Sequence, residues 1–278
     1  MTTWATRQML LAGGCAVGLI AAMPSSQVTA QSARPDFAFT GWLNENTFKG
    51  GEMLPVDGSP PLFHQDARYP FVPNNAGRQP TYRIADLSNP NVKQWAKDVM
   101  KKDNDEVLGG KIAYTARSSC KPAGVPGFDQ FGFQPIYILQ EATKVTMIFS
   151  GDAQVRHVYL DVPHSANVKP SWYGESVGHY EGDTLVIDTI GLNTKTFIDN
   201  YRTPHTEKLH VVERWHLIDD GKTLEVTFKV DDPDTYNEPW SASQHFRRSD
   251  VPYTEEVCAE GNFYLFDYGV PVANKPDF

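Results

Sequence analysis

The chain has 278 residues, a formal charge of −9, 20 prolines, 21 glycines and 12% aromatic residues. This acidic balance argues against nucleic acid and anionic membrane surfaces as partners. The composition is typical of a loop-rich β protein, and the length allows one all-β domain or two small domains.

The first thirty residues have the features of an export signal. Arg7 supplies a positive charge near the N-terminus, and an apolar run extends from residue 9 to residue 23. Small residues before Gln31 offer a cleavage site. The apolar run is shorter than the roughly 20 residues that a membrane-spanning helix needs. We therefore expect residues 1–30 to be removed, no membrane span to remain, and the protein to be periplasmic or secreted.

Residues 31–110 are expected to form a Pro-rich N-terminal arm and one amphipathic helix, both packed on the main body. The predicted helix has Asn89 as its N-cap and Pro90 at its first position, and it ends near Lys102. Its apolar face consists of Val92, Trp95, Ala96, Val99 and Met100.

Two cysteines, Cys120 and Cys258, follow the expected signal. An oxidising compartment favours a disulfide between such a pair. The bond would join the region before the main β segment to the C-terminal tail. The alternative is two unrelated buried thiols.

Short strands and tight turns alternate from about Gln134 onward, and residues 111–278 are therefore predicted to form a mainly β, antiparallel domain. We expect a closed or nearly closed lipocalin-like barrel, because small barrels of this type can hold one ligand inside. A β-sandwich is the alternative architecture.

One hairpin is predicted around the turn residues Asp220 and Gly221. Its register places Glu213 opposite Phe228, on the apolar face of the hairpin. A carboxylate among apolar groups must find a partner or hold a proton. Glu213 is therefore a candidate general acid or ligand-binding carboxylate, with a buried structural ion pair as the alternative.

A second hairpin is expected to turn at Glu181 and Gly182, which would place Glu175 opposite Asp188. His179 would lie on the same face. Two opposed carboxylates repel unless one is protonated or a cation lies between them. A divalent metal, a shared proton or a cluster of sugar hydroxyls would each explain the pair. The alternative is a solvated outer face with the register one residue off.

Histidines are concentrated in this region, since six of the eight lie in residues 157–216. The connection 191–208 between the two hairpins is long and polar, and long connections in compact domains are often binding loops. A single loop histidine is usually solvated, so the clustering carries the argument. The candidate side chains on the connections are His164, Trp172, Arg202 and His205.

Several standard signatures are absent, among them the P-loop, G-x-G-x-x-G, H-E-x-x-H and paired CxxC motifs. No nucleotide or other organic cofactor is predicted, and a divalent metal stays open because of the carboxylate pair. We also expect no serine or cysteine nucleophile.

Three segments, residues 171–189, 203–214 and 231–240, resemble a family of exported bacterial proteins of unknown function, usually labelled hypothetical. The resemblance covers roughly the C-terminal half of the chain and implies no particular activity. Members of that family often have histidine at the position of Glu175. A metal-binding or hydrogen-bonding role at this position is compatible with both residues.

These observations predict an exported small-molecule enzyme with His/carboxylate acid–base chemistry, acting as a lyase, hydratase or hydrolase on a small organic or carbohydrate-like substrate. The catalytic candidates are Asp188, His179, Glu213 and His205. The substrate-binding candidates are Glu175, His164, Trp172, Arg202 and Trp240. The alternative is a non-catalytic periplasmic ligand-binding or accessory protein.

Overall fold

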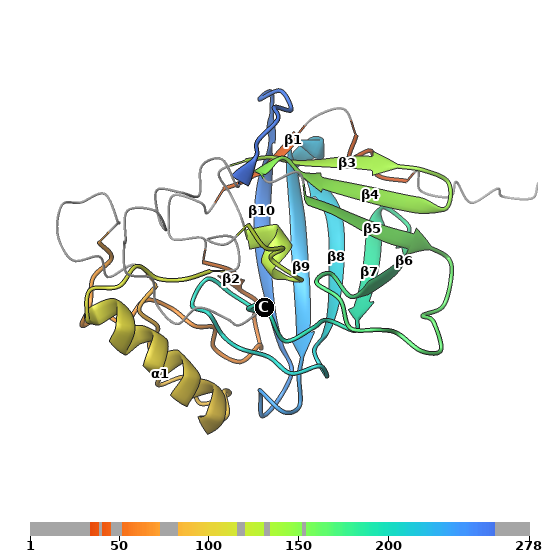
Figure 1. Cartoon of the computed structure of the whole chain (residues 1–278). Coiled ribbons are helices and arrows are strands. Elements are labelled where there is room, and N and C mark those ends of the chain that lie inside the picture. Colours follow the sequence, from red (N-terminus) through yellow and green to blue (C-terminus); the bar gives the residue numbers. More distant parts are fainter. Residues whose placement is uncertain are drawn as a thin grey trace, which may run out of the picture. The chain divides into compact units, whose positions relative to one another are not determined.

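A closed β-barrel forms the body of the protein in the computed structural model (Figure 1). The structure describes residues 34–38, 41–45, 52–72, 83–115, 120–130, 134–151 and 154–258. The export signal expected at residues 1–30 lies outside the described residues. The described residues belong to one compact unit.

The barrel is a ring of nine hydrogen-bonded strands. In chain order they are β1 (Gly41–Asn44), β3 (Ile136–Gln140), β4 (Lys144–Phe149), β5 (Gln154–Leu160), β6 (Glu175–Glu181), β7 (Thr184–Ile190), β8 (His210–Ile218), β9 (Thr223–Asp231) and β10 (Trp240–Ser249). The ring closes because β1 pairs with both β3 and β10. A further short strand, β2 (Leu54–Pro55), pairs with β10. The N-terminal region therefore supplies one strand of the barrel as well as segments around it.

The barrel is mixed, because β5 and β6 run parallel, with Val158 opposite Ser176. The mainly β class and the barrel are confirmed, and the prediction of a purely antiparallel sheet was wrong at this pair. Parallel neighbours need a crossover connection of about a dozen residues or more, and residues 161–174 provide it. These residues contain turn signals but nothing local that reveals the direction of the following strand.

The predicted register of β8 and β9 is confirmed. Glu213 lies opposite Phe228, and Trp215 lies opposite Val226. The turn between these strands contains the short 3-10 helix η5 (Asp219–Gly221).

The register of β6 and β7 differs from the prediction by two residues. Glu181 pairs with Thr184, and Glu175 therefore faces Ile190 instead of Asp188. The turn lies one residue later than expected, with Gly182 in the left-handed conformation at φ 64°. A shift of two residues keeps each side chain on its predicted face, because side chains alternate with period two.

The predicted helix exists, but its bounds were wrong, because α1 spans Gln94–Leu108. The side chain of Asn89 accepts the backbone N–H of Asn91 at 2.9 Å and so forms a turn before the helix. Asp103 and Asn104 continue the buried face as polar residues, which is why the apolar pattern stopped near residue 102. Figure 1 shows α1 outside the barrel. No helix within the described ranges has the length and apolarity needed to cross a membrane.

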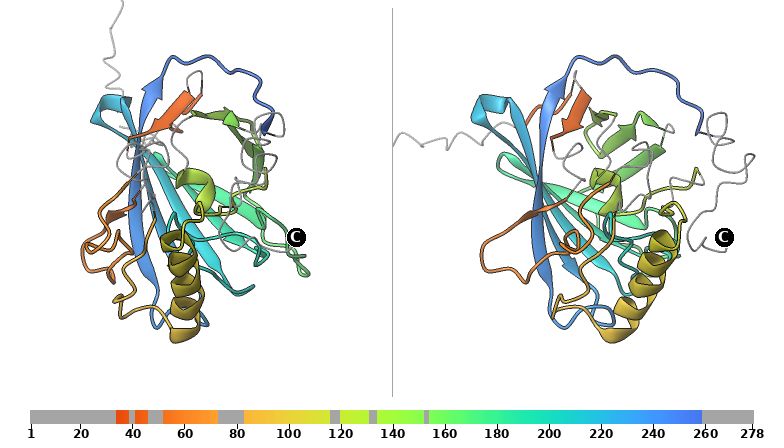
Figure 2. Two further views of the ribbon diagram at one scale, coloured as in Figure 1. Left: turned by 60° about the vertical axis from the view of Figure 1, so that its left-hand side comes forward. Right: turned by 90° about the vertical axis from the view of Figure 1, so that its left-hand side faces the viewer.

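Aromatic and apolar side chains fill the interior of the barrel. Trp42, Trp215, Phe228 and Phe246 have no exposed surface. The ring of Trp215 stacks on that of Phe246, with centroids 6.3 Å apart. The short 3-10 helix η3 (Gly127–Gln130) lies inside the ring of strands in both views of Figure 2. The interior is therefore a packed core.

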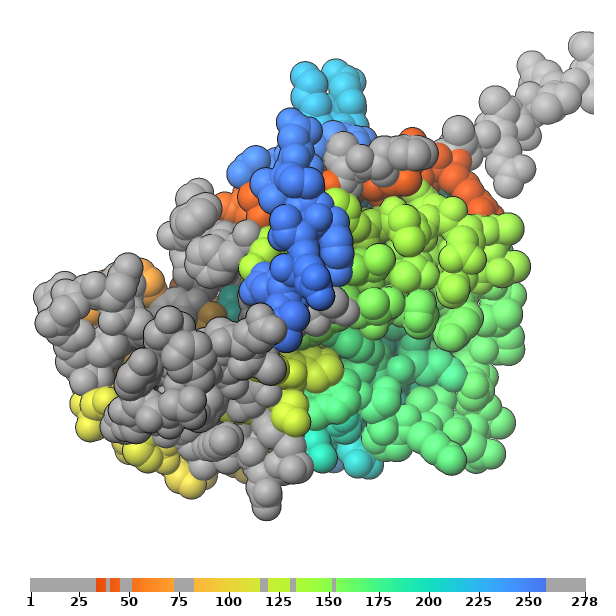
Figure 3. All heavy atoms as spheres, turned by 45° about the horizontal axis from the view of Figure 1, so that its top comes forward, coloured from red at the N-terminus to blue at the C-terminus, as the bar shows by residue number. Residues whose placement is uncertain are grey.

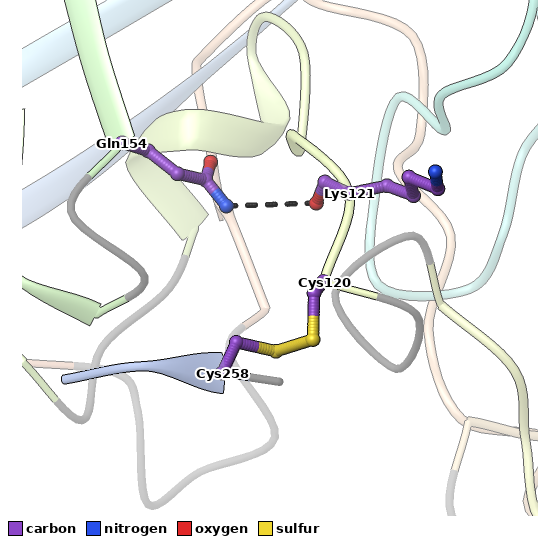
Figure 4. Close-up of a disulfide and its surroundings, with 4 residues drawn as sticks. All are labelled: Cys120, Lys121, Gln154 and Cys258. Carbon is purple, nitrogen blue, oxygen red and sulfur yellow. Dashed lines mark hydrogen bonds between the residues drawn. A yellow bond between two sulfur atoms is a disulfide. The ribbon is translucent and has the colours of Figure 1, made fainter. Parts of the chain in front are cut away.

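Cys120 and Cys258 form the predicted disulfide, with Cα atoms 5.6 Å apart (Figure 4). Close to it, the side-chain amide of Gln154 donates to the backbone carbonyl of Lys121. The bond ties the segment before η3 to the segment after β10. The latter lies on the surface in Figure 3, and its Val251 carbonyl accepts a hydrogen bond from the hydroxyl of Tyr137 in β3.

Candidate functional site

A pocket that is partly open to solvent lies where β10 begins, next to the segment that leads into β2; we call it the cavity. Met53, Leu62 and Phe63 form part of its apolar lining. Glu52 and Asp199 bring carboxyl groups to the wall. Small-molecule sites likewise combine an apolar lining with a few polar groups.

Tyr236 and Trp240 form a buried aromatic pair in the cavity wall, with ring centroids 5.7 Å apart and an edge-to-face arrangement. Their exposed fractions are 4% and 5%. In the described part of the chain, neither the Tyr236 hydroxyl nor the Trp240 indole N–H has a hydrogen-bond partner outside this pair. Both polar atoms are buried.

Burial raises the pKa of Tyr236 well above its usual value, and the charge of Asp199 adds to the effect. A side-chain hydrogen bond with Trp240 opposes this rise. The Tyr236 hydroxyl therefore keeps its proton at ordinary pH and serves as a hydrogen-bond donor. Trp240 is the substrate-binding candidate that the structure brings to the cavity.

Asp199 lies at the cavity wall on the connection that the sequence marks as a binding loop. Its Oδ2 accepts the hydroxyl of Thr203 at 2.6 Å, and its Oδ1 accepts the backbone N–H of Tyr201 at 2.8 Å. Burial raises the pKa of Asp199 despite these hydrogen bonds. Asp199 also lines a second hollow, which shares Gln130 and Asn200 with the first.

The loop around Asp199 is held from two sides. The side-chain amide of Gln130 in η3 donates to the carbonyl of Ile198 at 2.6 Å. The hydroxyl of Tyr201 donates to the carboxylate of Glu52. The loop therefore joins η3 to the N-terminal region at the cavity.

Arg202, a predicted substrate contact, is 1% exposed and faces α1, where its Nε lies 3.5 Å from Oδ2 of Asp103. His205, a predicted catalytic residue, is buried beneath the same loop. Its Nδ1 faces the carbonyl of Thr206 and therefore donates, so Nε2 accepts the hydroxyl of Thr196 at 2.9 Å. Burial lowers the pKa of His205, which favours this neutral form. Both side chains fasten the loop.

Glu213 lies inside the barrel, on the predicted face, and is paired with Arg156. Nη1 of Arg156 donates to Oε1 of Glu213 at 3.0 Å, and Nη2 donates to the hydroxyl of Thr189 at 2.9 Å. The exposed fractions of the Arg156 and Glu213 side chains are 1% and 0%. The geometry is that of a buried structural ion pair.

Asp129 of η3 is the second carboxyl group in the interior, and sequence reasoning missed it. It is fully buried, and no group in the described residues donates a hydrogen bond to either of its carboxyl oxygens. Burial, followed by the negative charge of Glu213, raises the pKa of Asp129 well above its usual value. A protonated Asp129 can donate to Glu213, so the two carboxyl groups and Arg156 form one interior charged centre.

Asp188 lies on the outer face of the barrel between two histidines. Its Oδ1 is 2.9 Å from Nε2 of His164 and 2.9 Å from Nε2 of His210. Nδ1 of His164 is 3.0 Å from Oε1 of Glu175. We refer to Glu175, His164, Asp188 and His210 as the outer cluster. The carboxylates predicted to share a face do so, but with His164 between them.

The pKa values in the outer cluster follow its contacts. Hydrogen bonds from Ser165 lower the pKa of Glu175. The hydrogen bond with His210 lowers the pKa of Asp188 and raises that of His210. Sequence reasoning had not chosen His210, although strand alternation places it on the outer face beside Asp188.

The remaining predicted site residues lie apart from the cavity. His179 is exposed and contacts Glu181 at 3.1 Å, so it does not join Asp188. Trp172 is half-buried and does not belong to the cavity lining in the described residues. A second outer group has Glu225 between His216 and His245, at 3.1 and 3.0 Å.

Sequence reasoning wrongly took the G-x-S-x-G pattern of a nucleophile elbow to be absent, although residues 174–178 match it. In the structure Ser176 lies within β6 and is buried. Its Oγ contacts the hydroxyl of Thr189 at 2.8 Å and accepts from Arg156 at 3.2 Å. The strand-to-helix turn that an elbow requires does not occur here, so the motif gives no support for a serine nucleophile.

No group of three or more His, Cys, Asp or Glu side chains in the described ranges is arranged to hold a metal ion. No protein-family model matches the chain, and no curated protein matches it. Inferences about function therefore depend on the geometry of the molecule.

Replacing Arg156 with methionine should lower the free energy of unfolding by about 3–5 kcal/mol, because Glu213 would be left buried without its partner. The double variant Arg156→Met/Glu213→Leu should recover most of this loss. Urea unfolding measures both. A loss below about 1 kcal/mol in the single variant would contradict a structural ion pair.

Replacing Asp188 with asparagine should destabilise the protein most between about pH 4 and pH 6.5. A lowered Asp188 pKa gives stability that is lost as pH falls, and a raised His210 pKa gives stability that is lost as pH rises. The loss should be about 1 kcal/mol or less, since the side chains are 39% and 41% exposed and solvent screens them. Urea unfolding at pH 5.5 and pH 9, with His179→Gln as control, tests this. Equal losses at both pH values would contradict the assignment.

Proposed function

We propose that this protein is an exported small-molecule-binding protein and that its ligand occupies the cavity beside Tyr236 and Trp240. The observation that carries the proposal is the lining of the cavity, in which apolar side chains of the N-terminal region meet a buried aromatic pair and the carboxyl group of Asp199. A partly open pocket with an apolar lining and few polar groups is typical of a site for a small organic molecule.

We also propose a lipocalin-like use of the barrel, with the strands as a rigid support for one ligand. The packed interior supports a site at the start of β10 in preference to the barrel axis. The disulfide between Cys120 and Cys258 is compatible with a periplasmic or secreted location, and the resemblance to exported bacterial proteins agrees with it.

A binding role fits the positions of the four predicted catalytic residues better than the acid–base enzyme expected from them. Asp188 and His179 lie on the outer face, Glu213 lies in the packed interior, and His205 lies beneath the loop. None of these belongs to the cavity lining formed by the described residues.

A second candidate function is acid–base catalysis on the molecule that the cavity holds, in a lyase, hydratase or hydrolase. The specific observation is Asp199, a carboxyl group at the cavity wall whose pKa is raised by burial. Such a carboxyl group keeps a proton closer to neutral pH and could act as a general acid. The variant Asp199→Asn separates the two functions, because a binding protein shows no turnover with either residue.

Filling the cavity should abolish ligand binding without unfolding the barrel. Leu62 lines the cavity, and the variant Leu62→Trp should remove the stabilisation that a bound compound gives the wild type. The control is Leu139→Trp, because Leu139 is 51% exposed on β3. A compound at 100 times its Kd should add about 2.7 kcal/mol to the free energy of unfolding of the wild type and the control.

The measurement is thermal unfolding in the presence of a library of small organic compounds. The proposal requires compounds that raise the Tm of the wild type and of Leu139→Trp but leave Leu62→Trp unchanged. It fails if no compound raises the Tm of the wild type, or if every active compound stabilises Leu62→Trp equally.

A further inference from the structure

The crossover 161–174 depends on polar contacts for its position on the barrel. The structure describes all of its residues, and none of them is buried, so apolar packing contributes little to holding it. Ser165 donates its backbone N–H to Glu175 of β6 at 2.7 Å. His164 also contacts β7, where its Nε2 lies 2.9 Å from Oδ1 of Asp188. The imidazole therefore links the crossover to a second strand.

Both ring nitrogens of His164 face carboxylate oxygens. Nδ1 lies 3.0 Å from Oε1 of Glu175, and Nε2 faces Oδ1 of Asp188. A neutral imidazole has one N–H and one bare lone pair, so one of the two contacts would bring a lone pair against a carboxylate. Only the imidazolium form donates a hydrogen bond to both oxygens. The geometry of the outer cluster therefore requires a proton on each ring nitrogen.

Both carboxylates stay ionised over the pH range in which histidines titrate. Hydrogen bonds from Ser165 lower the pKa of Glu175, and the hydrogen bond with His210 lowers the pKa of Asp188. An imidazole ordinarily loses its proton near pH 6.5. As pH rises through this range, the imidazole of His164 is therefore the partner that changes charge in the two contacts.

The other charged groups near these contacts act within the barrel. His210 of β8 contacts the same carboxylate oxygen of β7 at 2.9 Å, and this hydrogen bond raises its pKa most. On β9, Asp231 adds to the rise in the pKa of His210 and Lys229 opposes it. The strands β7, β8 and β9 are already hydrogen-bonded neighbours, so titration of His210 leaves the attachment of the crossover unchanged. Asp161 and Lys169, the charged residues of the crossover itself, take no part in these contacts.

The crossover also pairs with the loop that borders the cavity. The backbone N–H of Ser171 donates to the carbonyl of Gly191 at 3.0 Å, and the backbone N–H of Asn193 donates to the carbonyl of Ser171 at 2.9 Å. The two segments form a short parallel bridge where the loop 191–208 leaves β7. Asp199 follows on this loop and lines the cavity.

We infer that protonation of His164 controls how firmly the crossover and the start of the loop 191–208 are held on β7. When the ring loses a proton, Nδ1–H can still donate to Glu175, but the lone pair of Nε2 then faces Asp188. The crossover keeps its attachment to β6 and loses this attachment to β7. The bridge between Ser171 and the loop is weakened as a consequence. The attachment is therefore complete in acid and is lost as pH rises above that of ordinary histidine titration.

Hydrogen exchange of the backbone amides of Ser171 and Asn193 tests the inference, because these two amides form the bridge. Their protection factors, corrected for the intrinsic pH dependence of exchange, should fall at least about 3-fold between pH 5.5 and pH 8.5, a size that fits ion pairs of partly exposed side chains. The amides of β9 report global unfolding and separate it from local opening. The experiment needs no ligand, so its outcome is independent of the proposed function.

The variant His164→Gln removes the titrating group but keeps a side chain that can donate to Asp188. The two bridge amides should then show the same protection at both pH values. His179→Gln is the matched control, because His179 contacts Glu181 on β6 at 3.1 Å and does not contact the crossover. Its pH response should equal that of the wild type.

Four results would overturn the inference. The first is protection of the bridge amides that stays constant with pH in the wild type. The second is a pH response that persists in His164→Gln or is lost in His210→Gln, which would assign the response to another group. The third is a loss of protection at Ser171 without a loss at Asn193, because the loop would then be uncoupled from the crossover. The fourth is protection of the bridge amides equal to that of β9 at both pH values, since exchange would then be global.

Discussion

The buried guanidinium of Arg156 is the group on which the rest of the barrel depends, because it compensates the carboxylate of Glu213 inside a packed core. The same centre includes Asp129, which belongs to η3 and has no exposed surface. The next residue, Gln130, donates to the carbonyl of Ile198 and lines the cavity. The charged centre therefore lies within the packed interior, contacts η3 and, through η3, supports the loop that borders the cavity.

The outer cluster has a structural role that follows from the mixed topology. The crossover 161–174 carries His164, which lies between Glu175 and Asp188 on the barrel. Ser165, on the same crossover, donates its backbone N–H to Glu175 at 2.7 Å. These contacts fasten the crossover to the outer face and so stabilise the parallel arrangement of β5 and β6. The polar residues that suggested catalysis in the sequence thus have structural partners.

Local patterns predicted the parts of the fold that local chemistry determines. The turn residues after β8 were sufficient to place Glu213 opposite Phe228, and the cysteine count with the expected compartment was sufficient for the disulfide. The parallel pair and the cavity depend on contacts between distant segments. Trp240 was chosen from the sequence and lies in the cavity wall, whereas Asp199 and Tyr236 lie there and were not chosen. Asp199 lies on the loop already marked as polar and long, but no local pattern signals that Tyr236 is buried.

The most direct test of this account is the pH dependence of unfolding for the wild type and the variant Asp129→Asn. The folded protein holds the Asp129 proton more tightly than the unfolded chain, so this group's contribution to stability falls as pH rises above about 3.8. Asparagine cannot ionise and can still donate to Glu213. The account predicts that the variant gains stability relative to the wild type as pH rises from 4 to 8. A difference that stays constant with pH would contradict the interior charged centre.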